Sequence, residues 1–270
     1  MSLIASVTLK HFTVICSDGL AVRVENGALV PVCEQTCKYW TVANGDIAIG
    51  STGSALMSVL ISKFSTKLAE QHQDNPELFS ILEKAVPDEL QRLSKLFPTD
   101  AEYIDGSESR NLGGISLLMV GYDAAQQRIR AVNWDDECKE MCCQGKGPGL
   151  KPHENDSGTI LTLGYCTISS FSEKFDQSCV LDGPLAVANE MKSAIQQAAE
   201  ASPKFIGGDL FAHIIMLPEF RELYDSDLRE NETNEVRVAT AHQCDICELK
   251  TKDFRFLRNH EAATEGGRLG

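Results

Sequence analysis

The stretch DIAIGSTGSA, residues 46–55, joins an apolar run to a turn of glycine and hydroxyl residues, and an apolar helix-like segment follows. Such a turn could cradle a phosphate. A phosphate loop needs G-x-x-x-x-G-K-[ST] and a dinucleotide loop needs G-x-G-x-x-G, and Gly50 and Gly53 fit neither pattern. We therefore favour a tight strand-to-helix turn, although a helix that begins with small residues can still bind an anion. The predicted helix cap is Ser51, Thr52 or Ser54.

Ten cysteines could carry redox or metal chemistry, but their spacing is unlike that of a small secreted disulfide scaffold. Three of them lie in or beside apolar stretches and are predicted to be buried thiols: Cys16, Cys166 and Cys179. A tighter group occurs in ECKEMCCQGKGPG, at Cys138, Cys142 and Cys143. No histidine lies near this group, so we expect no metal there.

A second metal-like pattern lies near the end of the chain, in HQCDICELKTKDFRFLRNHE. Cys244 and Cys247 form a C-x-x-C, and His260 follows after a gap typical of zinc fingers. No second histidine follows His260, and His242 is too close to Cys244 for the usual finger. The alternatives are a zinc-stabilised binding module and a C-terminal helix with incidental thiols. We assign no metal ligand and no cofactor.

The composition limits the possible partners. The chain has 270 residues and a net charge of −14, from 25 basic and 39 acidic side chains. An acidic surface repels phosphate backbones, which argues against nucleic-acid binding. No stretch approaches the roughly 20 apolar residues of a membrane helix, and the first residues lack the features of a signal peptide. We expect a cytoplasmic protein that does not enter a membrane.

The first fifty residues predict an antiparallel meander of about five strands. Short β-branched runs alternate with turn signals at Lys10 and His11, at Asn26–Gly27 and at Asn44–Gly45. The apolar spacing then changes to a helical period over residues 54–71. A second helix is predicted over residues 75–96, broken near Pro87.

The rest of the chain alternates between strand and helix patterns. GGISLLMVGYD and QRIRAVNW predict a hairpin, GTILTLGYCTIS a strand, GPLAVANEMKSAIQQAAEAS an amphipathic helix and GGDLFAHIIML a last strand. Hairpins with segregated helices indicate an α+β fold. We predict one domain over residues 1–217, with a Cys-rich insertion near 135–156, and a charged C-terminal extension over 218–270.

In order and spacing, these motifs resemble the proteasome-type branch of the N-terminal nucleophile (Ntn) hydrolases. The resemblance rests on SLIASVTLKHFTVICSDGLA, a hairpin that ends in an aspartate, on EQTCKYWTV and on DIAIGSTGSALMSVLI. GGISLLMVGYD and SPKFIGGDLFAHIIM resemble later segments of that fold. The resemblance spans roughly residues 2–217. It implies a four-layer αββα sandwich of two antiparallel sheets with helices on both outer faces.

The resemblance also implies a mechanism. Members of this family use the side chain of their first mature residue as nucleophile and its α-amine as base, because an α-amine titrates near about pH 8. The matching nucleophile is Ser2, which removal of Met1 would expose. Lys38 matches the family's strand lysine, with Tyr39 as the alternative because the register is uncertain by one residue. Asp18 is expected to pair with Lys38 and orient it.

The oxyanion hole of the family uses a backbone N–H from the glycine turn before the long helix, which points to Gly53. Each of these residues also has an ordinary structural explanation. Ser2 could be an inert terminus, Asp18 a turn residue and Lys38 a solvated strand lysine.

Two positions depart from the family. Before the paired glycines, active peptidases carry an aspartate and then a serine, where this chain has Pro203 and Ile206. The resemblance therefore leaves two functions open: a peptidase or amidohydrolase that acts through Ser2, and a non-catalytic assembly or interaction subunit. For both, it implies a homo-oligomer or proteasome-like assembly. A peptide or amide is the substrate class of the active form.

Overall fold

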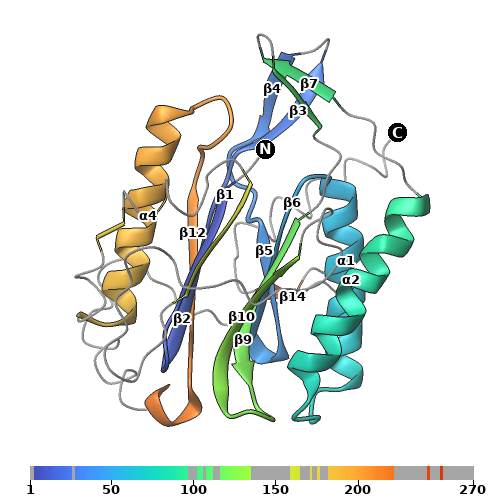
Figure 1. Cartoon of the computed structure of the whole chain (residues 1–270), viewed down its shortest axis with the longest axis vertical. Helices are drawn as coiled ribbons and strands as arrows, with labels where there is room; N and C mark the ends of the chain where they lie inside the picture. Colours follow the sequence, from blue (N-terminus) through green and yellow to red (C-terminus); the bar gives the residue numbers. More distant parts are fainter. Residues whose placement is uncertain are drawn as a thin grey trace.

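A computed structural model describes residues 3–25, 28–96, 116–134, 159–164 and 182–221, with short segments at 102–105, 108–111, 171, 175–176, 242–243 and 250–251. Its main body is a four-layer α+β sandwich, as predicted (Figure 1). Helix α4 (Pro184–Ala201) covers the outer face of the first sheet, and the second sheet packs on the inner face of the first (Figure 1). Helices α1 (Ala55–Gln71) and α2 (Leu78–Leu96) cover the outer face of the second sheet.

The first sheet has four antiparallel strands in the order β11-β1-β2-β12. Their bounds are Thr159–Gly164, Leu3–Thr8, Phe12–Asp18 and Leu210–Met216, respectively. The β1–β2 connection contains Lys10 and His11, as predicted, and Leu9 N–H closes it on Phe12 O at 2.8 Å. Strands β1 and β2 are buried along their whole length, because α4 covers one face and the second sheet covers the other.

The second sheet has the order β10-β9-β6-β5. Its strands span Arg128–Trp134, Ser116–Asp123, Ile47–Thr52 and Tyr39–Val42, respectively. All three neighbouring pairs are antiparallel. Strands β9 and β10 form the predicted hairpin. A 3-10 turn at Ala43–Gly45 connects β5 to β6, and Asn44 and Gly45 have φ of 55° and 95° there.

The prediction of a single N-terminal meander is wrong. The β1–β2 hairpin belongs to the first sheet and the β5–β6 hairpin to the second. Between them, β3 (Ala21–Glu25) and β4 (Ala28–Cys33) form a separate two-stranded ribbon that projects from the sandwich (Figure 1). Local turn signals gave the hairpins correctly, but the partners of each hairpin are chosen by packing between distant segments.

The three long helices begin and end close to their predicted bounds. Helix α1 spans Ala55–Gln71, and its cap is Ser54, whose Oγ accepts from Met57 N–H at 3.5 Å. Helix α2 spans Leu78–Leu96 and α4 spans Pro184–Ala201. The predicted break in α2 is wrong, because Pro87 lies inside a continuous helix. Burial of Val86 and Leu90 on either side of the proline compensates for the backbone hydrogen bond that it removes.

Two further pairs of short strands belong to neither of the four-stranded sheets. They are β7 (Glu102–Asp105) with β8 (Glu108–Asn111), and β13 (His242–Gln243) with β14 (Lys250–Thr251). The Cys-rich insertion over 135–156 lies outside the described residues, and so do Cys166, Cys179, Cys244, Cys247 and His260. None of the described helices is long and apolar enough to span a membrane.

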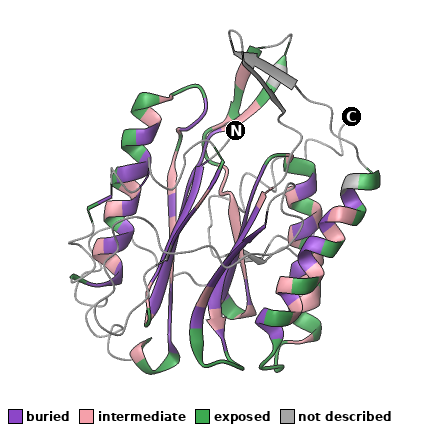
Figure 2. Ribbon diagram, in the orientation of Figure 1, coloured by how far each residue is buried: buried purple, intermediate pink, exposed green. Residues whose placement is uncertain are grey.

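Three apolar clusters fill the spaces between the layers (Figure 2). The cluster under α4 includes Cys16, which is fully buried as predicted. Burial raises the pKa of its thiol to about 12. On the opposite side, Arg130 ties α2 to the β9–β10 hairpin through Glu83 and Asp123, both at 2.9 Å. These contacts hold α2 against the second sheet.

A short connection after β4 packs tightly against the end of the first sheet. Asp209 N–H donates to Glu34 O at 2.7 Å, and Thr36 N–H donates to Gly19 O at 2.9 Å. A Cβ on Gly19 would lie 2.4 Å from Glu34 O. A Cβ on Gly208, which has φ of +74°, would lie 2.2 Å from the same oxygen. Both glycines are therefore needed for the backbones to approach.

The variant Gly208→Ala tests this packing. We expect it to lower the free energy of unfolding by roughly 2–4 kcal/mol, since it adds both a strained φ and a backbone clash. The matched control is Gly207→Ala, because a Cβ there meets nothing closer than 3.8 Å. Urea denaturation of both variants measures the effect, and equal stability of the two would contradict the packing argument.

Candidate active site

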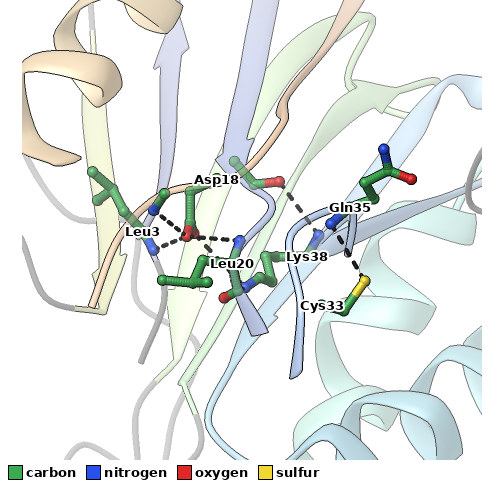
Figure 3. Close-up of polar contacts among 8 residues, drawn as sticks. Leu3, Asp18, Leu20, Cys33, Gln35 and Lys38 are labelled. Atoms are coloured by element: carbon green, nitrogen blue, oxygen red, sulfur yellow. Dashed lines mark hydrogen bonds and ion pairs between the residues drawn. The ribbon is translucent and has the colours of Figure 1, made fainter. Parts of the chain in front are cut away.

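Asp18 is the centre of the candidate site and is the last residue of β2. Its side chain is fully buried, and its carboxylate accepts backbone N–H groups from three segments (Figure 3). Oδ1 accepts from Leu3 at 2.8 Å, and Oδ2 accepts from Leu20 at 3.3 Å and from Gly207 at 3.2 Å. The carboxylate therefore fixes the start of β1 against the junction before β12.

Lys38 is the cationic partner of this carboxylate. Its Nζ lies 3.8 Å from Asp18 Oδ1, its side chain is 8% exposed, and it also donates to Leu20 O. Sequence reasoning predicted the pairing of these two residues, and the structure brings them together. Their catalytic roles are a separate matter and stay a prediction.

The backbone of Lys38 connects the two sheets. Its N–H donates to Ser17 Oγ at 3.3 Å, and Ser17 belongs to β2 in the first sheet. Its carbonyl oxygen accepts from Ser51 N–H at 3.0 Å, and Ser51 belongs to β6 in the second sheet. The lysine side chain therefore starts from a backbone position that both sheets define.

Burial shifts the pKa of both partners. Desolvation lowers the pKa of Lys38, and the Asp18 charge opposes that effect. Desolvation likewise raises the pKa of Asp18, against the Lys38 charge and the three backbone N–H donors. In each case burial is the largest cause, so the pair is held in an environment that disfavours charge.

The other predicted site residues are placed differently. Gly53 has φ of 109° and immediately precedes the helix cap Ser54, two residues beyond the Ser51 that bonds Lys38. Tyr39, the alternative to Lys38, packs with the apolar cluster between the sheets, and its ring centroid is 6.4 Å from that of His213. Ser2 lies outside the described residues. It is joined covalently to Leu3, whose N–H Asp18 holds.

Pro203 and Ile206 bring no polar side chain toward the pair. Pro203 is exposed, and Ile206 is buried in the cluster under α4. Sequence reasoning missed Ser17, the carbonyl of Leu20 and the N–H of Gly207 as partners of the pair. In the sequence, only the paired glycines at Gly207 and Gly208 pointed to one of these partners. Backbone donors and acceptors cannot be recognised from the type of side chain.

Among the described residues, no group of three or more His, Cys, Asp or Glu side chains could hold a metal ion. The chemistry that the pair itself can support is electrostatic. A buried ammonium favours the neutral form of a nearby amine and stabilises negative charge that develops close to it. The pair lies where the chain enters β1, because Asp18 Oδ1 contacts both Leu3 N–H and Lys38 Nζ.

A double-mutant cycle tests the coupling of the pair. Lys38→Met leaves a buried carboxylate without its cation. Asp18→Asn removes the negative charge and places a side-chain amide opposite the backbone N–H donors. We expect each single change to lower the free energy of unfolding by about 3–5 kcal/mol. The double variant should lose less than the sum of the two, with a coupling of about 1–3 kcal/mol in urea denaturation. Additive losses would show that the two side chains do not interact.

The lowered pKa of Lys38 predicts a pH dependence of stability. The folded chain releases this proton at a lower pH than the unfolded chain, so the unfolded state binds more protons between the two pKa values. This stability contribution is complete above the unfolded pKa of about 10.4 and is lost as pH falls through the folded pKa. The difference in unfolding free energy, wild type minus Lys38→Met, should therefore rise as the pH increases toward the unfolded pKa of about 10.4. A difference that falls with pH would have the wrong sign.

Comparisons with known proteins find likenesses among solved structures but no sequence relative. No protein-family model matches the chain, and no curated protein does. The crystal structure of eukaryotic HslV from Trypanosoma brucei is similar with a TM-score of 0.45 and 15% identity, over 79% of this chain and 99% of that one. The layers and strand orders define the fold, and the contacts of Asp18 and Lys38 define the candidate site.

Proposed function

We propose that this chain is a proteasome-like Ntn-hydrolase homologue that cleaves an amide bond through Ser2, after removal of Met1. The observation that carries the proposal is the buried Asp18–Lys38 pair, whose carboxylate binds the N–H of Leu3. This contact fixes the peptide group that joins Ser2 to β1. A buried charged pair costs stability, and such pairs are more common where their charge has a function.

The proposed reaction is acyl transfer. The hydroxyl of Ser2 attacks the amide carbonyl carbon, and its own α-amine accepts the hydroxyl proton. That proton then passes to the leaving amine as the C–N bond breaks, which leaves an ester on Ser2. Water hydrolyses the ester with the same amine as base. Lys38 would keep the α-amine neutral through its charge, and a backbone N–H at Gly53 would stabilise the oxyanion.

A peptide epoxyketone probe tests this function, because it forms a stable adduct only with a free α-amine beside a nucleophilic side chain. We expect one adduct, mapped to Ser2, in intact and peptide mass spectra. Ser2→Ala should abolish the adduct, and Lys38→Met should slow its formation by about 100-fold. Lys10→Met is the matched control, since Lys10 is an exposed lysine on the β1–β2 turn and its loss should change nothing.

Retention of Met1, or its removal without adduct formation, would contradict the Ser2 mechanism. That outcome would support the second candidate, a non-catalytic assembly or interaction subunit. The observation that favours this candidate is the apolar character of Pro203 and Ile206, which supply neither the carboxylate nor the hydroxyl of active peptidases. Analytical ultracentrifugation of the unreactive protein would then show whether it assembles with itself.

A further inference from the structure

Two serine hydroxyls connect the two sides of the turn that contains Gly53. This turn leads from the end of β6 into the start of α1 (Figure 1). Ser51 Oγ donates to Ser58 Oγ at 2.6 Å, and Ser58 Oγ donates to Ser54 O at 3.0 Å. The hydroxyls therefore join the strand before the turn to the helix cap after it.

Ser51 also contacts the backbone of the candidate site. The residue is 4% exposed, and its N–H donates to Lys38 O at 3.0 Å. Its backbone therefore holds the segment of Lys38, while its side chain holds the first turn of α1 through Ser58. As a result, consecutive hydrogen bonds link the backbone of Lys38 to the helix that follows Gly53.

Ser58 lies in the first turn of α1, where a hydroxyl is not needed to form the helix. Its N–H already donates to Ser54 O at 3.0 Å, and its hydroxyl donates to the same oxygen. Such a second bond from a helical serine does not stabilise a helix, and alanine has the higher helix propensity. The contribution that alanine could not replace is the acceptor that Ser58 Oγ offers to Ser51.

Gly53 needs support from its neighbours because its own backbone is permissive. It is exposed and has φ of 109°, a conformation that glycine adopts without steric cost. A backbone N–H that stabilises a developing negative charge has to be aligned closely, and a displacement of about 1 Å can slow a reaction roughly 100-fold. The bonds of Ser51 and Ser58 fix the chain on both sides of this glycine.

We propose that Ser51 and Ser58 are positioning residues, which hold the N–H of Gly53 in register with Lys38 through the hydrogen bond between their hydroxyls. They act through the backbone of the turn and exchange no proton with the reacting atoms. The effect on the reaction rests on the proposed function, in which Gly53 stabilises the oxyanion. The structural link between Lys38 and α1 does not depend on that function and can be measured separately.

The first experiment measures how fast the full-length protein reacts with the peptide epoxyketone over a range of probe concentrations. We expect Ser51→Ala and Ser58→Ala each to lower the maximal rate by about tenfold, because the oxyanion donor is less well aligned. The probe concentration that gives the half-maximal rate should not change, since binding is not affected. The double variant should react no more slowly than either single variant, because both changes break the same bond.

Two further variants separate positioning from a general loss of structure. Ser58→Thr keeps a hydroxyl at this position and should restore the wild-type rate. Ser62→Ala is the matched control, because Ser62 lies one turn further along α1 and its hydroxyl takes no part in these bonds. A reactive wild type whose rate is unchanged by both Ser51→Ala and Ser58→Ala would overturn the proposal. Equal losses in Ser58→Ala and Ser62→Ala would overturn it as well.

Amide hydrogen exchange tests the structural link without any activity. The Ser51 N–H that donates to Lys38 O should exchange at least about fivefold faster in Ser58→Ala than in the wild type, because the strand end opens locally more often. Ser62→Ala should leave its exchange unchanged. A wild type that forms no adduct would reject the proposed function, and faster exchange in Ser58→Ala would still support the link. Unchanged exchange of the Ser51 N–H in Ser58→Ala would overturn the link.

Discussion

The geometry at the start of β1 depends on how the buried carboxylate of Asp18 is stabilised away from water. Asp18 has no exposed side-chain surface, and an unpaired buried carboxylate would cost several kcal/mol. Three N–H donors and one ammonium compensate for that cost, and they come from four separate segments. None of these segments can move independently of the others without leaving Asp18 under-solvated, so the carboxylate sets the geometry of the chain's entry into β1.

The two sheets meet through the partner of that carboxylate. The backbone of Lys38 bonds to Ser17 of the first sheet and to Ser51 of the second, so its side chain reaches Asp18 from a fixed point. The preceding residues cannot relax, because Glu34 lies directly against Gly19 and Gly208. Gly19 and Gly208 therefore influence a charged side chain indirectly. They allow the backbone of Glu34 to come close, and this close approach determines where the Lys38 side chain ends.

Features that depend on neighbouring residues could be predicted from the sequence. The hairpin turns, the cap at Ser54, the amphipathic helix α4 and the pairing of Asp18 with Lys38 by motif resemblance belong to this group. Features that depend on distant segments could not. The division of the N-terminal hairpins between sheets is one example, and the bond from Gly207 to Asp18 across 189 residues is another. Pro87 was misjudged because tertiary packing outweighed a local rule.

The pKa directions explain why this pair points to function rather than to stability alone. Burial opposes the charge on both side chains, so the ion pair by itself contributes little net stability. What it provides is a poorly screened positive charge close to the start of β1, because Asp18 Oδ1 contacts both Lys38 Nζ and Leu3 N–H. An amine base in that position needs such a charge, since the charge favours the neutral amine.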